Sequence, residues 1–115
     1  MIEVTLREYL ENELNVPVYM EVPKSIPASY VLLQLIDAGR IDHIDAATFN
    51  VIVKGDTLYS AAELRDEVKA ALLNSITLNG ISHVDQGGEI AGIDSANKTY
   101  QYELTFNFYF YKEET

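Results

Sequence analysis

Apolar and polar side chains alternate almost without interruption over residues 99–112. A period of two is typical of a β-strand, because successive side chains point to opposite faces of the pleat. The predicted strand is about twice the usual length of ~5–6 residues, so it should dominate a sheet with one buried and one wet face. The apolar positions are Tyr100, Tyr102, Leu104, Phe106, Phe108 and Phe110, and the polar positions are Thr99, Gln101, Glu103, Thr105 and Asn107.

The polar face of this strand ends in two tyrosines, Tyr109 and Tyr111. Tyrosine on a polar surface favours a protein interface, since the ring offers apolar area and the hydroxyl a hydrogen bond. We therefore predict Tyr109 and Tyr111 as interface residues. The alternation assigns most of the other aromatic residues of the strand to the core.

Shorter strand patterns occur at four further places. Residues 16–22 predict a short strand, and residues 30–36 are almost continuously apolar, which favours a central strand covered on both faces. Residues 48–54 alternate, and residues 81–85 predict another short strand. The polar residues 37–45 around Gly39 predict a turn between the second and third strands.

A glycine-rich segment precedes the long strand. Residues 86–98 contain Gly87, Gly88 and Gly92 and show no clear period, which predicts a long loop. Ile90 and Ile93 have no local core to join, so we predict them as interface residues in a loop that is mobile until a partner orders it. The glycines do not predict a phosphate-binding loop, because no lysine–serine pair and no helical pattern follow them.

Two capping boxes predict two helices. In each, a hydroxyl residue is followed three positions later by glutamate, so that each side chain can bond the other's backbone amide: Thr5 with Glu8, and Ser60 with Glu63. Apolar residues at helical spacing follow both boxes. The predicted buried stripes are Leu6, Leu10 and Leu14 in the first helix and Leu64, Val68, Ala71 and Leu72 in the second.

The predicted order of elements is α-β-β-β-α-β-β, in one domain that covers residues 1–115. Runs of strands separated by few helices indicate an α+β domain. We predict a mostly antiparallel sheet of about four to five strands with two helices packed on one face. Leu104, Phe106 and Phe108 should pack under the two helix stripes.

Composition narrows the class of function. The chain has no cysteine, which excludes disulfides, thiol catalysis and thiolate metal sites. The formal net charge of −10 repels a phosphate backbone and argues against tight nucleic-acid binding, although it allows DNA to pass nearby. The sequence has neither a signal-peptide pattern nor an apolar run of ~20 residues, so we expect a cytoplasmic protein without a membrane segment.

The best metal-like cluster in the sequence is formed by Asp42, His43 and Asp45. Neighbours on one loop cannot surround an ion without ligands from elsewhere, so a solvated turn is the preferred interpretation. His83, close to Asp85, is interpreted as a surface histidine, because no nucleophile or base partner is visible beside it. We predict no catalytic residue, no metal ligand and no cofactor-binding residue.

Three short phrases stand out beside the predicted order of the elements. These phrases are Val16-Pro17-Val18-Tyr19, Pro27-Ala28-Ser29-Tyr30-Val31 and Ser60-Ala61-Ala62-Glu63-Leu64. In these phrases and in the order of its elements, over essentially its full length, the chain resembles the tail terminator, or tail-completion, proteins of long-tailed bacteriophages and prophages.

The resemblance implies a structural protein, not an enzyme, that forms a hexameric ring on the tail tube and joins it to the neck of the head. It implies the tail tube protein and a head–neck connector protein as partners, no specific nucleic-acid binding, and a location in the virion tail or neck after assembly in the host cytoplasm. We expect ring contacts at an edge strand, either residues 99–112 or residues 16–22, with Tyr109 and Tyr111 as anchors.

Three alternatives remain open from the sequence. The chain can be another neck or minor tail protein of the virion, which would share its size and acidity. It can be a small enzyme or ligand-binding domain that uses the Asp42, His43 and Asp45 loop. It can also be an acidic inhibitor that mimics DNA, which requires a stripe of carboxylates on one rigid face.

Overall fold

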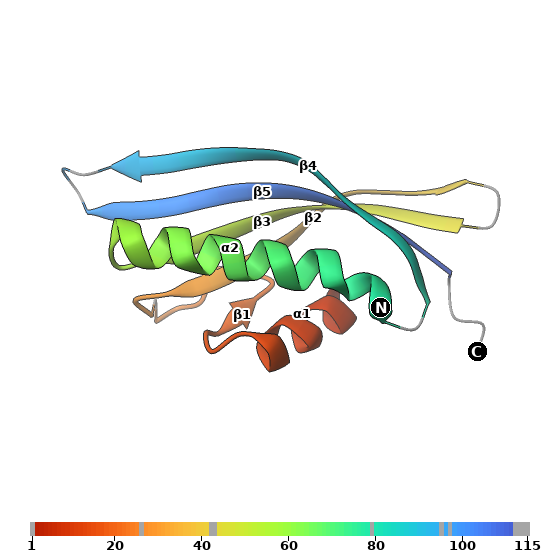
Figure 1. Cartoon of the computed structure of the whole chain (residues 1–115), viewed down its shortest axis with the longest axis horizontal. Coiled ribbons are helices and arrows are strands. Elements are labelled where there is room, and N and C mark those ends of the chain that lie inside the picture. The colour runs from red at the N-terminus through yellow and green to blue at the C-terminus, as the bar shows by residue number, and fades with distance from the viewer. Residues whose placement is uncertain are drawn as a thin grey trace.

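The computed structural model of the chain describes residues 2–25, 27–41, 44–78, 80–94, 96 and 98–111 (Figure 1). The elements follow the predicted order of one helix, three strands, one helix and two strands. A 3₁₀ turn, η1, follows the second helix. The elements are α1 (Ile2–Glu13), β1 (Val18–Tyr19), β2 (Tyr30–Ile41), β3 (Ile44–Gly55), α2 (Leu58–Asn74), η1 (Ser75–Thr77), β4 (Ile81–Asp94) and β5 (Thr99–Phe110).

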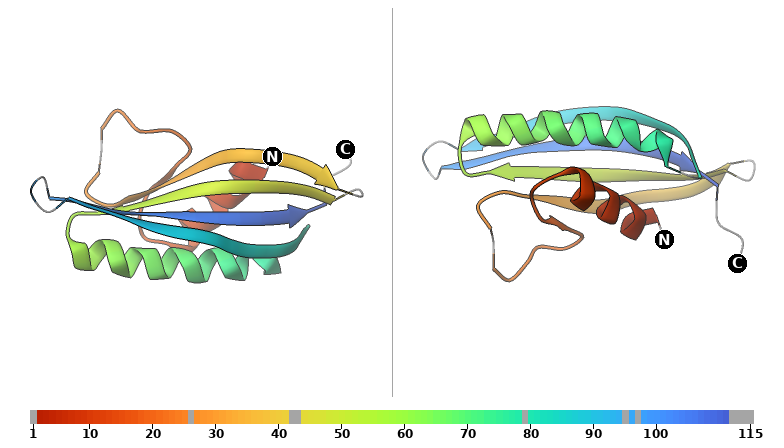
Figure 2. Two further views of the ribbon diagram at one scale, coloured as in Figure 1. Left: turned by 90° about the horizontal axis from the view of Figure 1, so that it is seen from above. Right: turned by 60° about the horizontal axis from the view of Figure 1, so that its bottom comes forward.

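The strands form one sheet in the order β1-β2-β3-β5-β4. β1 is parallel to β2, and all other neighbours are antiparallel. Both helices cover the same face of this sheet (Figure 2). The opposite face is open except around Tyr30 and Leu32 of β2, which are buried. The prediction of an α+β fold with a mostly antiparallel sheet and two helices on one face is confirmed.

The core lies between the helices and the covered face of the sheet. Phe106 pairs in register with Phe49 of β3, and both rings are fully buried. The Phe108 ring packs edge-on against Phe49 with ring centroids 5.6 Å apart. Leu104, Phe106 and Phe108 share one core cluster with the leucines of α1 and with Leu64, Val68 and Leu72 of α2, so the predicted packing is confirmed.

Both helices begin earlier than predicted. α1 begins at Ile2, which places Thr5 inside the helix and not at its cap. α2 is capped by Thr57, whose Oγ1 accepts a hydrogen bond from the Ser60 amide at 3.0 Å, while the Thr57 amide donates to Ser60 Oγ at 3.1 Å. Ser60 therefore closes the capping box instead of opening one. The predicted capping box was wrong because the hydroxyl of Ser60 accepts the hydrogen bond from the cap amide that the sequence pattern assigns to a glutamate.

The glycine-rich segment predicted as a loop is strand. β4 runs from Ile81 to Asp94 and pairs along its length with β5. The long neighbouring strand supplies hydrogen-bond partners to a segment whose own composition does not favour β-structure, which is a tertiary effect. The predicted turn at residues 37–45 is also wrong, since β2 continues to Ile41 and β3 begins at Ile44. Here too, pairing with a neighbouring strand extends the β-structure beyond what the local sequence indicates.

The predicted edges also need correction. β5 lies between β3 and β4, so the long strand is interior and cannot be a free edge. The strand predicted over residues 16–22 contains only Val18 and Tyr19, and it borders β2 at two positions. β2 was predicted to be central and covered on both faces. It is buried from Tyr30 to Leu33, whereas residues 34–40 are exposed.

Candidate functional site

The open face of the sheet carries a row of hydrogen-bonded polar side chains. Thr48 Oγ1 of β3 donates to Asn107 Oδ1 of β5 at 2.7 Å, and Asn107 Nδ2 donates to Asp85 Oδ1 of β4 at 2.9 Å. Register brings these residues side by side, because paired residues of antiparallel strands share a face. The hydrogen bonds fix the side chains of a surface that is otherwise flat and wet.

At the end of this row, Asp85 lies beside His83, and a histidine next to a carboxylate is a pair that can act in acid–base catalysis. His83 Nε2 lies 3.3 Å from Asp85 Oδ2, and the His83 ring contacts the Tyr109 ring with centroids 5.6 Å apart. The hydroxyl of the neighbouring Ser82 donates to the Tyr109 carbonyl and is thereby engaged away from the imidazole. The side chains of His83 and Asp85 are 59% and 44% exposed, so water reaches both groups freely. This geometry can hold a polar partner, but it gives no shelter to a reacting group.

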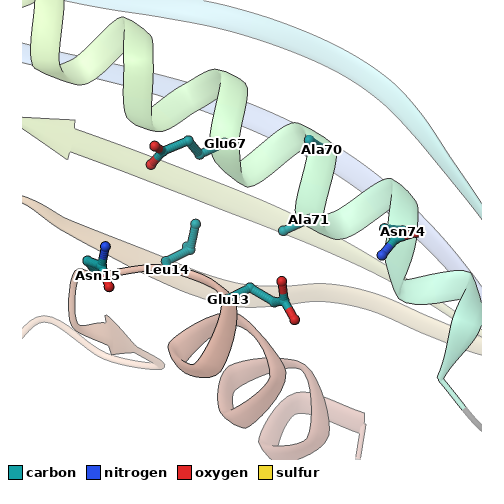
Figure 3. A pocket seen from close by; sticks show the side chains of 7 residues that line it. All are labelled: Glu13, Leu14, Asn15, Glu67, Ala70, Ala71 and Asn74. Carbon is teal, nitrogen blue, oxygen red and sulfur yellow. The ribbon is translucent and has the colours of Figure 1, made fainter.

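An open groove of about 530 Å³ separates the C-terminal end of α1 from α2 (Figure 3). Tyr9 Oη donates to the Ala71 carbonyl at 2.8 Å and ties the two helices together beside it. Burial, and secondarily the charge of Glu13, raises the pKa of Tyr9, which keeps the phenol protonated as a donor. The groove is lined by Glu13, Leu14, Asn15, Glu67, Ala70, Ala71 and Asn74.

The cations of α2 reach across to the edge strand β4. Lys69 Nζ donates to Glu89 Oε1 at 2.9 Å, and Arg65 Nη1 lies 3.9 Å from Glu89 Oε2. The hydrogen bond from Lys69 lowers the pKa of Glu89. The Arg65 guanidinium also stacks over the Tyr102 ring at 4.6 Å and bonds to Asp66, which holds it in place. Two positive charges therefore offset the acidic charge of β4 at this point.

The structure does not bring the four predicted interface residues together. Tyr109 is half-buried on the open face, and Tyr111 is 58% exposed just beyond the same strand end. Ile90 and Ile93 are 67% and 39% exposed, but they lie toward the other end of the β4–β5 hairpin. They also lie on opposite faces, since Ile90 pairs with Glu103 and Ile93 with Tyr100. The prediction therefore splits into two separate surfaces.

Sequence reasoning missed the exposed edge of β2. Leu35 and Ile36 are 40% and 58% exposed there, although the apolar run around them predicted a covered strand. It also missed the contacts of Lys69 and Arg65 with Glu89, which join residues at least 20 positions apart. No local signal in the sequence reports such a long-range ion pair.

Asp42 and His43 of the predicted metal-like cluster lie outside the described residues. Asp45 is described, and its carboxylate lies 3.8 Å from Arg40 Nε. Within the described part of the chain, no three histidine or acidic side chains gather in a way that can hold a metal ion. No helix in that part is both long and apolar enough to cross a membrane. Neither a protein-family model nor a curated protein matches this chain.

Proposed function

We propose that this chain is a structural assembly protein of a long-tailed bacteriophage or prophage, which forms a ring on the end of the tail tube and joins it to the neck of the head. The identification rests on the resemblance in element order and short phrases to the tail terminator proteins. The geometry that supports it best is a sheet whose two outer edges, β4 and the part of β2 beyond Leu32, lack partner strands in the described part of the chain. Such edges suit repeated pairing between subunits.

The charge of the open face supports a role near DNA without binding to it. Asp37, Asp85 and Glu103 share this face through their cross-strand pairs. Lys54 of the same face is held over the Tyr30 ring, 5.8 Å from its centroid. A wall of this sign repels phosphate, so DNA would slide past such a surface without being held.

The exposed and flat arrangement of His83 and Asp85 favours binding over catalysis, so the proposed protein works by contact alone. Its proposed partners are further copies of itself in a ring of six, the tail tube protein and a head–neck connector protein. Another neck or minor tail protein of the same virion would use the same free edges, and it is the alternative that a genetic test must separate.

Deletion of the encoding gene from its phage or prophage, followed by electron microscopy of the particles, tests the proposal. A tail terminator is expected to leave tails of uncontrolled length or tails that are not joined to heads, and the wild-type gene supplied in trans should restore both. Tails of normal length that remain detached would indicate a neck protein. Normal tails on normal heads would refute both assignments.

A further inference from the structure

Two sheet edges on opposite sides of the molecule lack a partner strand in the described residues. β4 pairs only with β5, and β2 pairs with β1 at Val31 and Leu32 only. Residues 88–94 of β4 pair with β5 in unbroken register, so their outer backbone groups form a regular row. On β2 the corresponding row is residues 33–41, divided by one register shift between Leu35 and Asp37.

The β4 row lacks the usual protection of an edge strand, whereas the β2 row carries Arg40 and one register shift. Residues 88–94 contain no lysine, arginine or proline, the residues that most often prevent edge-to-edge pairing. Each row also exposes large aliphatic side chains, Ile90 on β4 and Leu35 and Ile36 on β2.

Electrostatics favours the β4 edge as a place where one acidic copy can meet another. A net charge of −10 makes most surfaces of two copies repel each other. On β4, however, Lys69 and Arg65 offset the charge of Glu89. On the exposed part of β2, Arg40 lies 3.8 Å from Asp45 of β3, and Asp37 adds one negative charge. Repulsion between copies is therefore reduced at the β4 edge, around Glu89.

The strand directions select the type of pairing. β2 and β4 run in opposite directions, because three antiparallel steps separate them in the order β2-β3-β5-β4. Rotation about an axis parallel to the strands leaves the strand directions unchanged. If a second copy is placed beside the first by such a rotation, its β2 therefore runs antiparallel to β4 of the first copy. Pairing of β4 with itself would leave both β2 edges open, whereas head-to-tail pairing uses both edges in a single repeated contact that can close into a ring.

We propose that copies of this chain join head to tail through their sheet edges, with the β4 edge of one copy paired with the β2 edge of the next. The contact deepens the proposed function, since it rests on the proposed ring and identifies its subunit interface. The helices then stay on one side of the joined sheet, and the open polar faces stay on the other.

Two lysine substitutions on exposed side chains test this contact whatever its register. Ile90→Lys places a charge on the β4 edge, and Ile36→Lys places one on the β2 edge; the two isoleucines are 67% and 58% exposed, so folding should be retained. Val22→Lys, at a residue that is 61% exposed outside both edges, is the matched control. Each substitution makes the net charge less negative, so any loss of association cannot come from added repulsion between copies.

Native mass spectrometry and sedimentation velocity of the purified chains, over a concentration series, give the readout. The wild type and Val22→Lys should form a closed oligomer of one size, and each edge variant alone should remain monomeric. An equal mixture of Ile90→Lys and Ile36→Lys should give dimers and nothing larger, because only one intact edge of each kind remains for pairing. Circular dichroism should show the same fold for all four proteins.

Several outcomes would overturn the inference. A wild type that stays monomeric at every concentration, an Ile36→Lys variant that assembles normally, or a mixture that stays monomeric would each exclude head-to-tail edge pairing. If both edge variants still form rings, the interface is wrong while the proposed ring survives. If the mixture gives the expected dimers but gene deletion leaves phage tails normal, the interface stands and the proposed function falls.

Discussion

Substitution of Gly55 by alanine should destabilise the protein because α2 begins almost in contact with the end of β3. A Cβ atom at position 55 would lie 2.5 Å from the Ala61 amide nitrogen and 2.7 Å from Ala61 Cα. Carbon contacts are most favourable at ~3.5–4.0 Å, so the first turn of α2 would have to move by about 1 Å. Both obstructing atoms belong to the backbone of a buried residue, which cannot rotate away.

The magnitude follows from two opposing terms. Overpacking of this kind costs about 1–3 kcal/mol. The loss of glycine's freedom in the unfolded chain returns about 0.4–1 kcal/mol, because the φ angle of Gly55 is not in the positive region. The net loss is then about 1–2 kcal/mol of the free energy of unfolding. For 115 residues, 1 kcal/mol corresponds to about 4 °C in Tm, so Tm should fall by about 4–8 °C.

Gly39→Ala provides the matched control, since a Cβ at Gly39 of β2 meets nothing within 4 Å. That variant should keep the wild-type Tm or exceed it slightly. Thermal melts followed by circular dichroism, with urea titrations for the free energy, make the comparison. Equal melting of the two alanine variants would refute the close approach of α2 to β3, and with it the placement of Lys69 and Arg65 over β4.

Three further predictions concern the core, an ion pair and the tyrosines. Phe106→Ala should lower the free energy of unfolding by ~3–5 kcal/mol, because the ring is fully buried; an unchanged melt would show that the buried face of β5 is wrongly assigned. Glu89→Gln should cost about 0.5 kcal/mol at neutral pH. The folded-state pKa of Glu89 is below its ordinary 4.5, so this stabilisation is present above pH 4.5 and is lost as the pH falls through the folded-state pKa. A difference in unfolding free energy between the wild type and Glu89→Gln that persists in stronger acid, measured by urea titration, would contradict this prediction. A Tyr109→Ala, Tyr111→Ala double variant should fold but fail to complement the gene deletion, and normal tails in micrographs would remove both tyrosines from the interface.

The register of the strands explains which parts of the sheet were predictable. β5 keeps one register with β3 over its whole paired length, so its alternation could be read directly from the sequence. β4 has two register shifts, and Gln86 and Glu89 consequently share the helix-covered face although they are three residues apart. A bulge of this kind breaks the period of two on which strand prediction depends. The segment therefore looked like a glycine-rich loop.

The candidate contact surface was predictable only in part. The exposure of Ile90 and Ile93 was expected, because the sequence around them offers no local core. The exposure of Tyr111 was expected, because this residue follows the polar face of its strand. The free edges themselves were not predictable, since they follow from the order of the strands in the sheet. The observed order places β5, the strand predicted to be an edge, between β3 and β4. Neutralisation of Glu89 by Lys69 likewise depends on how α2 crosses the sheet.

Direct localisation of the protein on assembled particles tests the central claim. Cryo-electron microscopy of phage particles whose copy of this chain carries a small tag should show one ring of tagged density at the head-proximal end of each tail tube, with the sheet continuous from subunit to subunit. Tagged density along the whole tube, at the distal tip or inside the head, or an absence of the tag from purified particles, would contradict the assignment as a tail-completion ring.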